Sequence, residues 1–261
     1  MEVIIRRDVK DAAALTARII ANAIIDKPRL ALGLATGRTM EKVYAELVRL
    51  YEKGLLDFAQ VATFNLDEYI GLPPEAPHSY RYYMSQHLFD KVNIDPRNTH
   101  LPDGMAEDYD KACKQYEAKI VEYGGIDLQV LGIGRTGHIG FNEPLSAMRS
   151  RTREKALSPQ TVAQNAPLFD QPGDMPRRAL TMGVGTILDA RRCILLATGE
   201  EKANIIAKAV EGPVTSMISA TALQLHPACT IIVDEAAASD LARPEYYRWI
   251  FENEPEWESY R

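Results

Sequence analysis

The chain has 261 residues, of which 30 are lysine or arginine and 36 are aspartate or glutamate, and its formal net charge is −6. With 46% hydrophobic and 25% charged residues, the composition is that of a folded globular protein and excludes a disordered or collagen-like chain. The acidic balance argues against a nucleic-acid-binding protein, which usually presents a basic face. A small anionic ligand is compatible with it, since a few positive groups in one cleft are sufficient.

The cysteines and the N-terminal residues point to a reducing compartment. The 3 cysteines form no C-x-x-C pair, which predicts free thiols. Charges of both signs within residues 1–8 argue against a signal peptide. The sequence contains no apolar run of the ~20 residues that cross a bilayer. We therefore expect a cytoplasmic protein without membrane contact.

Short apolar runs alternate with segments of helical periodicity in the first half of the chain. Residues 3–5, 30–34 and 61–64 predict buried strands. Asp8 is placed to cap a helix that continues to about Ile20. A second helix is predicted from about Met40 to a stop at Gly54.

The same alternation continues in the second half. Strands are predicted at residues 128–131, 193–197 and 230–233, and helices at about 105–120 and 201–210. Apolar strands separated by helices are typical of a parallel sheet covered on both faces. We therefore predict an α/β fold with a single open, mainly parallel, Rossmann-like sheet and helices on both faces, in one domain spanning residues 1–261.

Three irregular features accompany this pattern. The proline-rich residues 72–77 predict an exposed loop within the domain. The turn-rich residues 158–178 predict a mobile flap. Trp249 and Trp257 lie close to the C-terminal end, where either a helix docked on the body or a subunit contact would explain them.

The first segment that could carry chemistry lies between the strand at 30–34 and the following helix. Backbone N–H groups at a helix start attract phosphate, and the hydroxyls of Thr36 and Thr39 add donors. Gly37 allows a close backbone approach, and Arg38 adds a charged fork. The alternative is an ordinary tight turn in which Thr39 only caps the helix. The segment alone favours neither interpretation.

The second segment places Asp67 and Glu68 after the strand at 61–64. Ligands in open parallel sheets bind beyond the carboxyl ends of the strands. A carboxylate in that position could take a proton from a carbon beside a carbonyl group. The alternative is a pair of solvated loop charges, and the segment alone favours that alternative.

The third segment is glycine-rich, runs from Gly132 to Pro144 after the strand at 128–131, and contains a literal G-x-G-x-x-G. A dinucleotide-binding fold needs a helix here, but Pro144 comes too early for one, so we reject that interpretation. His138 with Glu143 five residues later suits acid–base work on a small ligand, because the carboxylate can hold the imidazole in one tautomer. The alternative is a histidine bonded only to a backbone carbonyl.

Lys202 and the remaining histidines complete the candidates. Lys202 begins a helix and could bind an anion, although a solvated surface lysine is the more common role. His78, His87, His100 and His226 show no metal-binding spacing, so we predict no metal.

In combination, these segments resemble the glucosamine-6-phosphate deaminase (isomerase) family. The similar blocks are residues 32–37, 63–69, 137–144, 150–153, 179–186 and 223–227, which follow one another in register over nearly the whole chain. The resemblance implies conversion of glucosamine 6-phosphate and water to fructose 6-phosphate and ammonia, by a single open α/β domain without a metal or redox cofactor. It implies a small-molecule sugar phosphate as the partner and is compatible with a homo-oligomer.

The resemblance also implies the catalytic roles. Asp67 would be the general base that moves a proton between C2 and C1. His138 would open the pyranose ring with support from Glu143. At Thr136 many relatives carry an acidic residue or asparagine. Threonine can form a hydrogen bond but supplies no negative charge, so we expect His138 to depend more on Glu143.

The substrate-binding roles follow in the same way. The loop from Thr36 to Thr39 and Lys202 would hold the phosphate, and backbone groups near Gly132 and Gly140 would face the sugar hydroxyls.

Two departures from the family pattern concern charge. Pro167 stands where an arginine is expected to contact the phosphate, and proline has no donor. We expect Arg38 to replace that charge. Arg153 and Lys155 match positions of an allosteric site in some relatives, whereas Ala147 replaces a serine there, so activation by N-acetylglucosamine 6-phosphate is left open.

Three alternative functions stay open at this point. One is deamination of another hexosamine 6-phosphate, such as galactosamine 6-phosphate. A second is a sugar-phosphate lactonase, because 6-phosphogluconolactonases share a related fold. The third is a non-catalytic sugar-phosphate sensor.

Overall fold

Parallel strands form the central sheet in the computed structural model, which describes residues 1–261 except for the side chain of Pro172. In the described residues, the order of the strands is β1-β10-β9-β6-β2-β3-β5. The strands are β1 (Glu2–Arg6), β2 (Ala31–Leu34), β3 (Ala62–Asn65), β5 (Thr99–His100), β6 (Leu128–Leu131), β9 (Arg192–Ala197) and β10 (Cys229–Asp234). Their apolar side chains are mostly buried, as the continuous apolar runs predict for a sheet covered on both faces.

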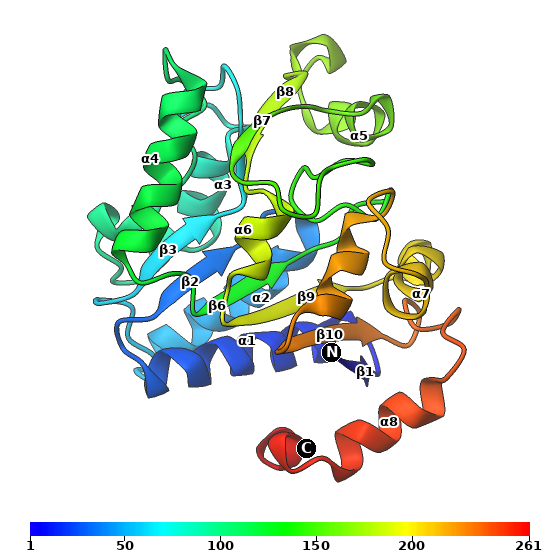
Figure 1. Ribbon diagram of the computed structural model, residues 1–261. Coiled ribbons are helices and arrows are strands. Elements are labelled where there is room, and N and C mark those ends of the chain that lie inside the picture. Colours follow the sequence, from blue (N-terminus) through cyan, green and yellow to red (C-terminus); the bar gives the residue numbers. More distant parts are fainter.

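Helices cover both faces of this sheet (Figure 1). Helix α1 begins where Asp8 accepts a hydrogen bond from the backbone N–H of Asp11 at 2.8 Å, as predicted, and it packs against α2. On the opposite face, Tyr116 and Tyr123 of the α4 region pack around Phe64 of β3. The helices are α1 (Val9–Asp26), α2 (Arg38–Glu52), α3 (Tyr80–His87), α4 (Tyr109–Glu122), α5 (Pro159–Asn165), α6 (Val184–Leu188), α7 (Ala203–Glu211) and α8 (Pro244–Asn253).

The sheet has a topological switch point between β2 and β6. After β2 the chain continues outward to β3 and β5, whereas after β6 it continues in the other direction to β9 and β10. The loops that follow these two neighbouring strands therefore diverge, and such a point is where ligands bind in open α/β sheets. The loops contain residues 35–37 and 132–138, which the sequence analysis singles out.

A second, antiparallel sheet in the order β4-β8-β7 continues from the carboxyl edge of the first. Its strands are β4 (Asp67–Tyr69), β7 (Arg153–Ala156) and β8 (Arg178–Thr181). Asp67 and Arg153 both pair with Thr181 of β8. β4 follows β3 almost at once, so the acidic segment leaves the parallel sheet and enters the antiparallel one. This sheet was not predicted, because its strands are short and β7 is polar and incompletely buried.

The boundaries of four helices differ from the predictions. α1 extends to Asp26 rather than to about Ile20, and α4 begins at Tyr109 rather than at about residue 105. α2 begins slightly earlier, at Arg38, and its N-cap is Gly37 with φ +117°. Thr39 therefore lies inside the helix, and its interpretation as the cap is wrong. α7 begins at Ala203, because residues 200–202 form a short 3₁₀ turn before it.

The two tryptophans have different environments. Trp257 is completely buried (0% exposed), and its Nε1 donates to the Glu2 carboxylate at 2.9 Å. The C-terminal segment is thus docked on the first strand. Trp249 of α8 is 53% exposed.

Candidate active site

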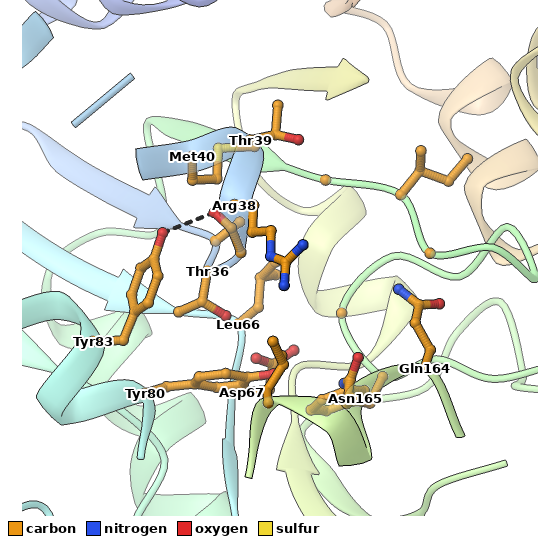
Figure 2. A pocket seen from close by; sticks show the side chains of 18 of the residues that line it. Thr36, Arg38, Thr39, Met40, Leu66, Asp67, Tyr80, Tyr83, Gln164 and Asn165 are labelled. Carbon is orange, nitrogen blue, oxygen red and sulfur yellow. Dashed lines mark hydrogen bonds between the residues drawn. The ribbon is translucent and has the colours of Figure 1, made fainter. Parts of the chain in front are cut away.

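A cavity of about 570 Å³ opens at the switch point, between the loops after β2 and β6 (Figure 2). β4 and the segment that contains α5 supply the other walls. Most of the predicted site residues line it: Thr36, Gly37, Arg38, Thr39, Asp67, Gly132, His138, Gly140 and Lys202. The three distant segments of the sequence therefore meet in one place.

Asp67 is the first residue of β4 and is only 6% exposed. Burial, with a smaller contribution from the charge of Glu68, raises the pKa of Asp67 to about 8. A carboxyl group with a pKa near neutrality is suited to proton transfer. The interpretation of Asp67 as a solvated loop charge is wrong.

Glu68 points the other way and fixes the local backbone. Its carboxylate accepts hydrogen bonds from the N–H groups of Tyr69 (2.8 Å), Tyr80 (2.9 Å) and Arg81 (2.9 Å). The last two donors belong to the first turn of α3, whose orphan N–H groups need acceptors. Glu68 thus ties β4 to α3 and helps to hold Asp67 in place, so it is not a solvated charge either.

His138 contacts the two side chains that were predicted to support it. Its Nδ1 lies 2.8 Å from Thr136 Oγ1 and 3.2 Å from Glu143 Oε2. Thr136 and Glu143 thus stand behind the imidazole rather than in the cavity wall. The alternative of a histidine bonded only to a backbone carbonyl is wrong.

Glu143 is ionised at neutral pH. Burial alone would raise its pKa, but hydrogen bonds with His138 and Thr161 outweigh burial and lower the pKa to about 2. The carboxylate therefore favours a proton on Nδ1 of His138, which leaves Nε2 as the nitrogen that exchanges protons with a ligand.

Gly140 brings the glycine-rich loop next to Asp67. Its φ is +54°, and a Cβ atom at this position would lie 2.9 Å from Thr181 Oγ1 and 3.4 Å from Asp67 Oδ2. A side chain would therefore be strained and would crowd the base. This close approach places the loop that carries His138 against Asp67 in the cavity.

Three positively charged side chains line the cavity: Arg38, Arg135 and Lys202. The Arg38 side chain extends from the start of α2 into the space that Asp67 faces (Figure 2). Lys202 is half-buried and its Nζ donates to Ile133 O at 2.8 Å, so it is not a solvated surface lysine. Burial lowers its pKa. Arg135, which the sequence analysis missed, also lines the cavity.

The predicted flap supplies a neutral wall. Gln164, Asn165, Leu168 and Phe169 line the cavity, and none of them was predicted from the sequence. Asn165 Nδ2 also donates to Tyr69 Oη at 3.1 Å. Pro167 in the same segment is exposed.

The family model and the most similar named proteins both point to glucosamine-6-phosphate isomerases or deaminases. Residues 7–233 match a family model described as glucosamine-6-phosphate isomerases/6-phosphogluconolactonase. A glucosamine-6-phosphate deaminase from Shewanella loihica is 50% identical over 250 residues, covering 96% of this chain and 93% of the relative. A deaminase of the same name from an Arthrobacter species is 49% identical over 258 residues, covering 99% of both chains.

Among solved structures, a deaminase is more similar to this chain than a lactonase is. One described as a monomeric glucosamine-6-phosphate deaminase superposes with a TM-score of 0.90 at 41% identity, covering 92% of this chain and 100% of the other. A 6-phosphogluconolactonase from Trypanosoma cruzi has a TM-score of 0.74 at 22% identity, covering 92% of this chain and 97% of the other, and this likeness concerns the fold alone.

Proposed function

The chain belongs to the family of glucosamine-6-phosphate isomerases and 6-phosphogluconolactonases, and we propose that its cavity converts glucosamine 6-phosphate and water to fructose 6-phosphate and ammonia. The observation that carries this proposal is the meeting of Asp67, the His138–Glu143 pair and three cationic side chains in one cavity. Relatives of about 50% identity are named glucosamine-6-phosphate deaminases, whereas the lactonase shares only the fold.

The first step is opening of the sugar ring. His138 takes the proton of the C1 hydroxyl and delivers a proton to the ring oxygen, so the bond between C1 and the ring oxygen breaks and the C1 aldehyde forms. The ionised Glu143 faces Nδ1 of His138 and holds the ring in one tautomer. Thr136 adds a hydrogen bond at the same nitrogen.

The second step is the isomerisation. Asp67 takes the proton from C2 and returns it at C1 through an enol-type intermediate. One proton of the C2 amine moves to the C1 oxygen, so the aldehyde becomes a C1 alcohol and the C2 amine becomes an imine. Water adds to the imine carbon and ammonia leaves, which yields the C2 ketone. A single buried carboxylate beside both carbons is sufficient for the two proton transfers.

The phosphate is not consumed and anchors the reacting end. The N-terminus of α2 directs backbone N–H groups toward the cavity, and Arg38 and Lys202 add positive charge. Such remote binding energy orients the sugar carbons against Asp67. Gly132 and Gly140 line the cavity, and in this proposal their backbone groups face the sugar hydroxyls.

The test is ammonia release from a panel of hexosamine 6-phosphates, with lactone hydrolysis assayed in parallel. We expect release from glucosamine 6-phosphate and a loss of ~10³-fold or more in Asp67→Asn, because the base is removed. Preferred release from galactosamine 6-phosphate would instead identify the other epimer as substrate. Lactone hydrolysis without ammonia release, or binding without turnover in both proteins, would contradict the proposal.

Assembly and location are separate proposals. In the part of the chain that the structure describes, no helix has both the length and the apolarity needed to cross a bilayer. A cytoplasmic location stays a prediction, based on the free cysteines, which are typical of a reducing compartment. A homo-oligomer also stays a prediction, and sedimentation velocity tests it: a single species of 29.1 kDa would contradict it.

A further inference from the structure

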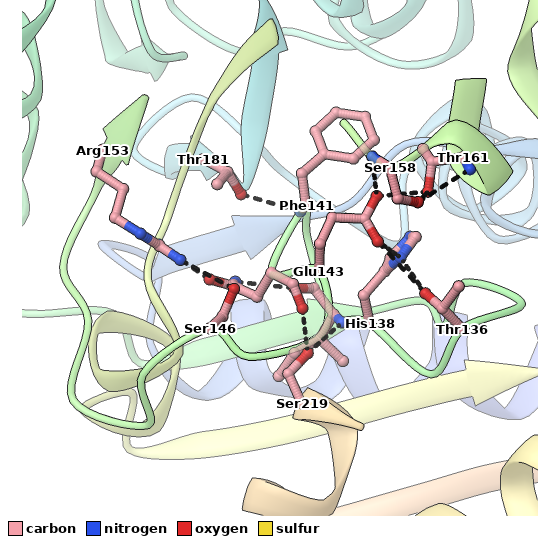
Figure 3. A network of polar contacts seen from close by, with 12 residues as sticks. Thr136, His138, Phe141, Glu143, Ser146, Arg153, Ser158, Thr161, Thr181 and Ser219 are labelled. Carbon is pink, nitrogen blue, oxygen red and sulfur yellow. Dashed lines mark hydrogen bonds and ion pairs between the residues drawn. The ribbon is translucent and has the colours of Figure 1, made fainter. Parts of the chain in front are cut away.

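Helix α5, which lies in the predicted flap, contacts the carboxylate of Glu143. Thr161 Oγ1 donates to Glu143 Oε1 at 2.5 Å, and the backbone N–H of Ser158 donates to the same oxygen at 3.1 Å (Figure 3). The other oxygen of Glu143, Oε2, faces Nδ1 of His138 at 3.2 Å. One carboxylate therefore joins the flap helix to the imidazole.

This contact lies away from solvent. Thr161 is 3% exposed and Glu143 is 4% exposed. A buried charged oxygen that loses its donor cannot readily replace it with water, so the side chain turns toward other donors. The Glu143 side chain has three rotatable bonds, and partners on both oxygens fix them.

The other end of α5 contacts the second catalytic segment. Asn165, in the last turn, donates to the hydroxyl of Tyr69 at 3.1 Å, and Tyr69 lies in β4 with Asp67. The helix therefore bridges the segments that carry the acid–base pair and the base.

We infer that the hydroxyl of Thr161 is a positioning residue for the reaction: it sets the orientation of Glu143 and, through Glu143, that of the His138 ring. The packing of α5 and the orientation of the imidazole are then coupled, because Glu143 contacts Thr161 of α5 with one oxygen and His138 with the other. This inference rests on the proposed function for the role of His138. It adds a residue that touches neither the sugar nor the phosphate.

The kinetic test uses three variants. Thr161→Val removes the hydroxyl and keeps the branched shape, and Thr161→Ser restores the hydroxyl. Thr186→Val is the matched control, because Thr186 is equally buried and its Oγ1 donates to Glu117 Oε1 at 2.6 Å, in a contact between α6 and α4. We expect Thr161→Val to lower kcat by about tenfold or more, with KM changed less than about twofold. Thr161→Ser should recover most of the kcat, and Thr186→Val should lose thermal stability alone.

A spectroscopic test needs no turnover. The ¹⁵N signals of the histidine rings are recorded for the free protein, with His138→Gln identifying the His138 signals. We expect the Nδ1 signal of His138 to move in Thr161→Val and to stay in place in Thr186→Val.

The outcomes separate this inference from the proposed function. Equal kcat in Thr161→Val and Thr186→Val, or unmoved His138 signals in Thr161→Val, would overturn the role of Thr161. A wild-type protein that releases no ammonia would overturn the proposed function instead, and the nitrogen signals would then decide on Thr161 by themselves.

Discussion

Two carboxyl groups of the site have pKa values shifted in opposite directions. Burial, together with Glu68, raises the pKa of Asp67 to about 8, whereas hydrogen bonds with His138 and Thr161 outweigh burial and lower that of Glu143 to about 2. Environments that separate two titratable groups in this way assign them different chemical roles. Asp67 is suited to exchange a proton, and Glu143 is suited to remain a fixed negative charge.

Asp67→Asn should stabilise the protein while it removes activity. A carboxyl whose pKa is higher in the folded state than in the unfolded state favours folding only when protonated, so its ionisation costs stability as the pH rises from about 4 to about 8. Asparagine has no such cost. One pKa unit corresponds to about 1.4 kcal/mol, so a pKa raised to about 8 sets an upper limit of about 5 kcal/mol on the gain at pH 8, or about 10 °C or more in Tm. The gain at pH 5 should be smaller, at about 2 kcal/mol.

The control for this prediction is Asp234→Asn. Asp234 is also buried, but its carboxylate accepts hydrogen bonds from Gly199 N and Ala237 N, so the substitution should lower the Tm. Thermal unfolding at pH 5 and pH 8 measures both variants. A Tm gain for Asp67→Asn that is the same at the two pH values would show that ionisation of Asp67 is not the cause.

Arg38→Ala should weaken substrate binding with little effect on the chemical step. Loss of one charge-assisted hydrogen bond to phosphate costs roughly 1.5–3 kcal/mol, which corresponds to a rise in KM of about 10- to 100-fold. Arg38→Lys should give an intermediate KM, because lysine keeps the charge without the fork. Arg29→Ala is the control, since Arg29 is exposed and bonds only to Gln60 at the surface. Steady-state kinetics decides, and an unchanged KM in Arg38→Ala would remove Arg38 from the phosphate site.

The residues found from sequence are those that lie in short, chemically distinctive segments. Asp67 and His138 follow predicted strands, and the topology rule for parallel sheets brings such loops together. Thr161 and Asn165 contact side chains that lie elsewhere in the sequence, and the local sequence pattern does not indicate such pairs. Arg135 could have been found, because it lies within the glycine-rich loop itself.

At the element scale, the parallel strands were predictable and the antiparallel sheet was not. Each central strand is a continuous apolar run, which is the pattern of a strand buried on both faces. β4 and β7 are polar and short, and they form because Thr181 of β8 can pair with both. That pairing depends on where the parallel sheet has already placed the chain.

Glu68→Ala should destabilise the protein much more than loss of an ordinary helix cap. The variant leaves three backbone N–H groups of β4 and α3 without their charged acceptor, and we expect a cost on the order of 3 kcal/mol or more. Asp108→Ala, which removes the exposed cap of α4, should cost about 1 kcal/mol. Denaturant unfolding compares the two, and equal losses would mean that Glu68 does not join β4 to α3.

At the scale of the whole molecule, the last residues of the chain close on the first strand. Trp257 packs on Phe251 and Tyr260 and donates a hydrogen bond to Glu2, the first residue of β1. β1 is the edge of the sheet, with β10 and β9 between it and β6. The C-terminal segment therefore contributes to stability at the edge of the sheet, where β10 separates β1 from β9 and the cavity.

Trp257→Ala should lower stability and leave catalysis intact. Removal of a fully buried tryptophan costs about 3–5 kcal/mol, or about 10 °C in Tm for a chain of this size. By contrast, kcat and KM at 25 °C should stay within about twofold, because β10 lies between β1 and β9, and no residue of β1 or β10 lines the cavity. Trp249→Ala is the matched control, since the same side chain on α8 is exposed and stacks only on Tyr246, and it should change stability by less than about 0.5 kcal/mol. A large loss of kcat in Trp257→Ala, measured well below its Tm, would show that the C-terminal segment affects the cavity. Equal stability of the Trp257→Ala and Trp249→Ala variants would show that the C-terminal segment is not docked on β1.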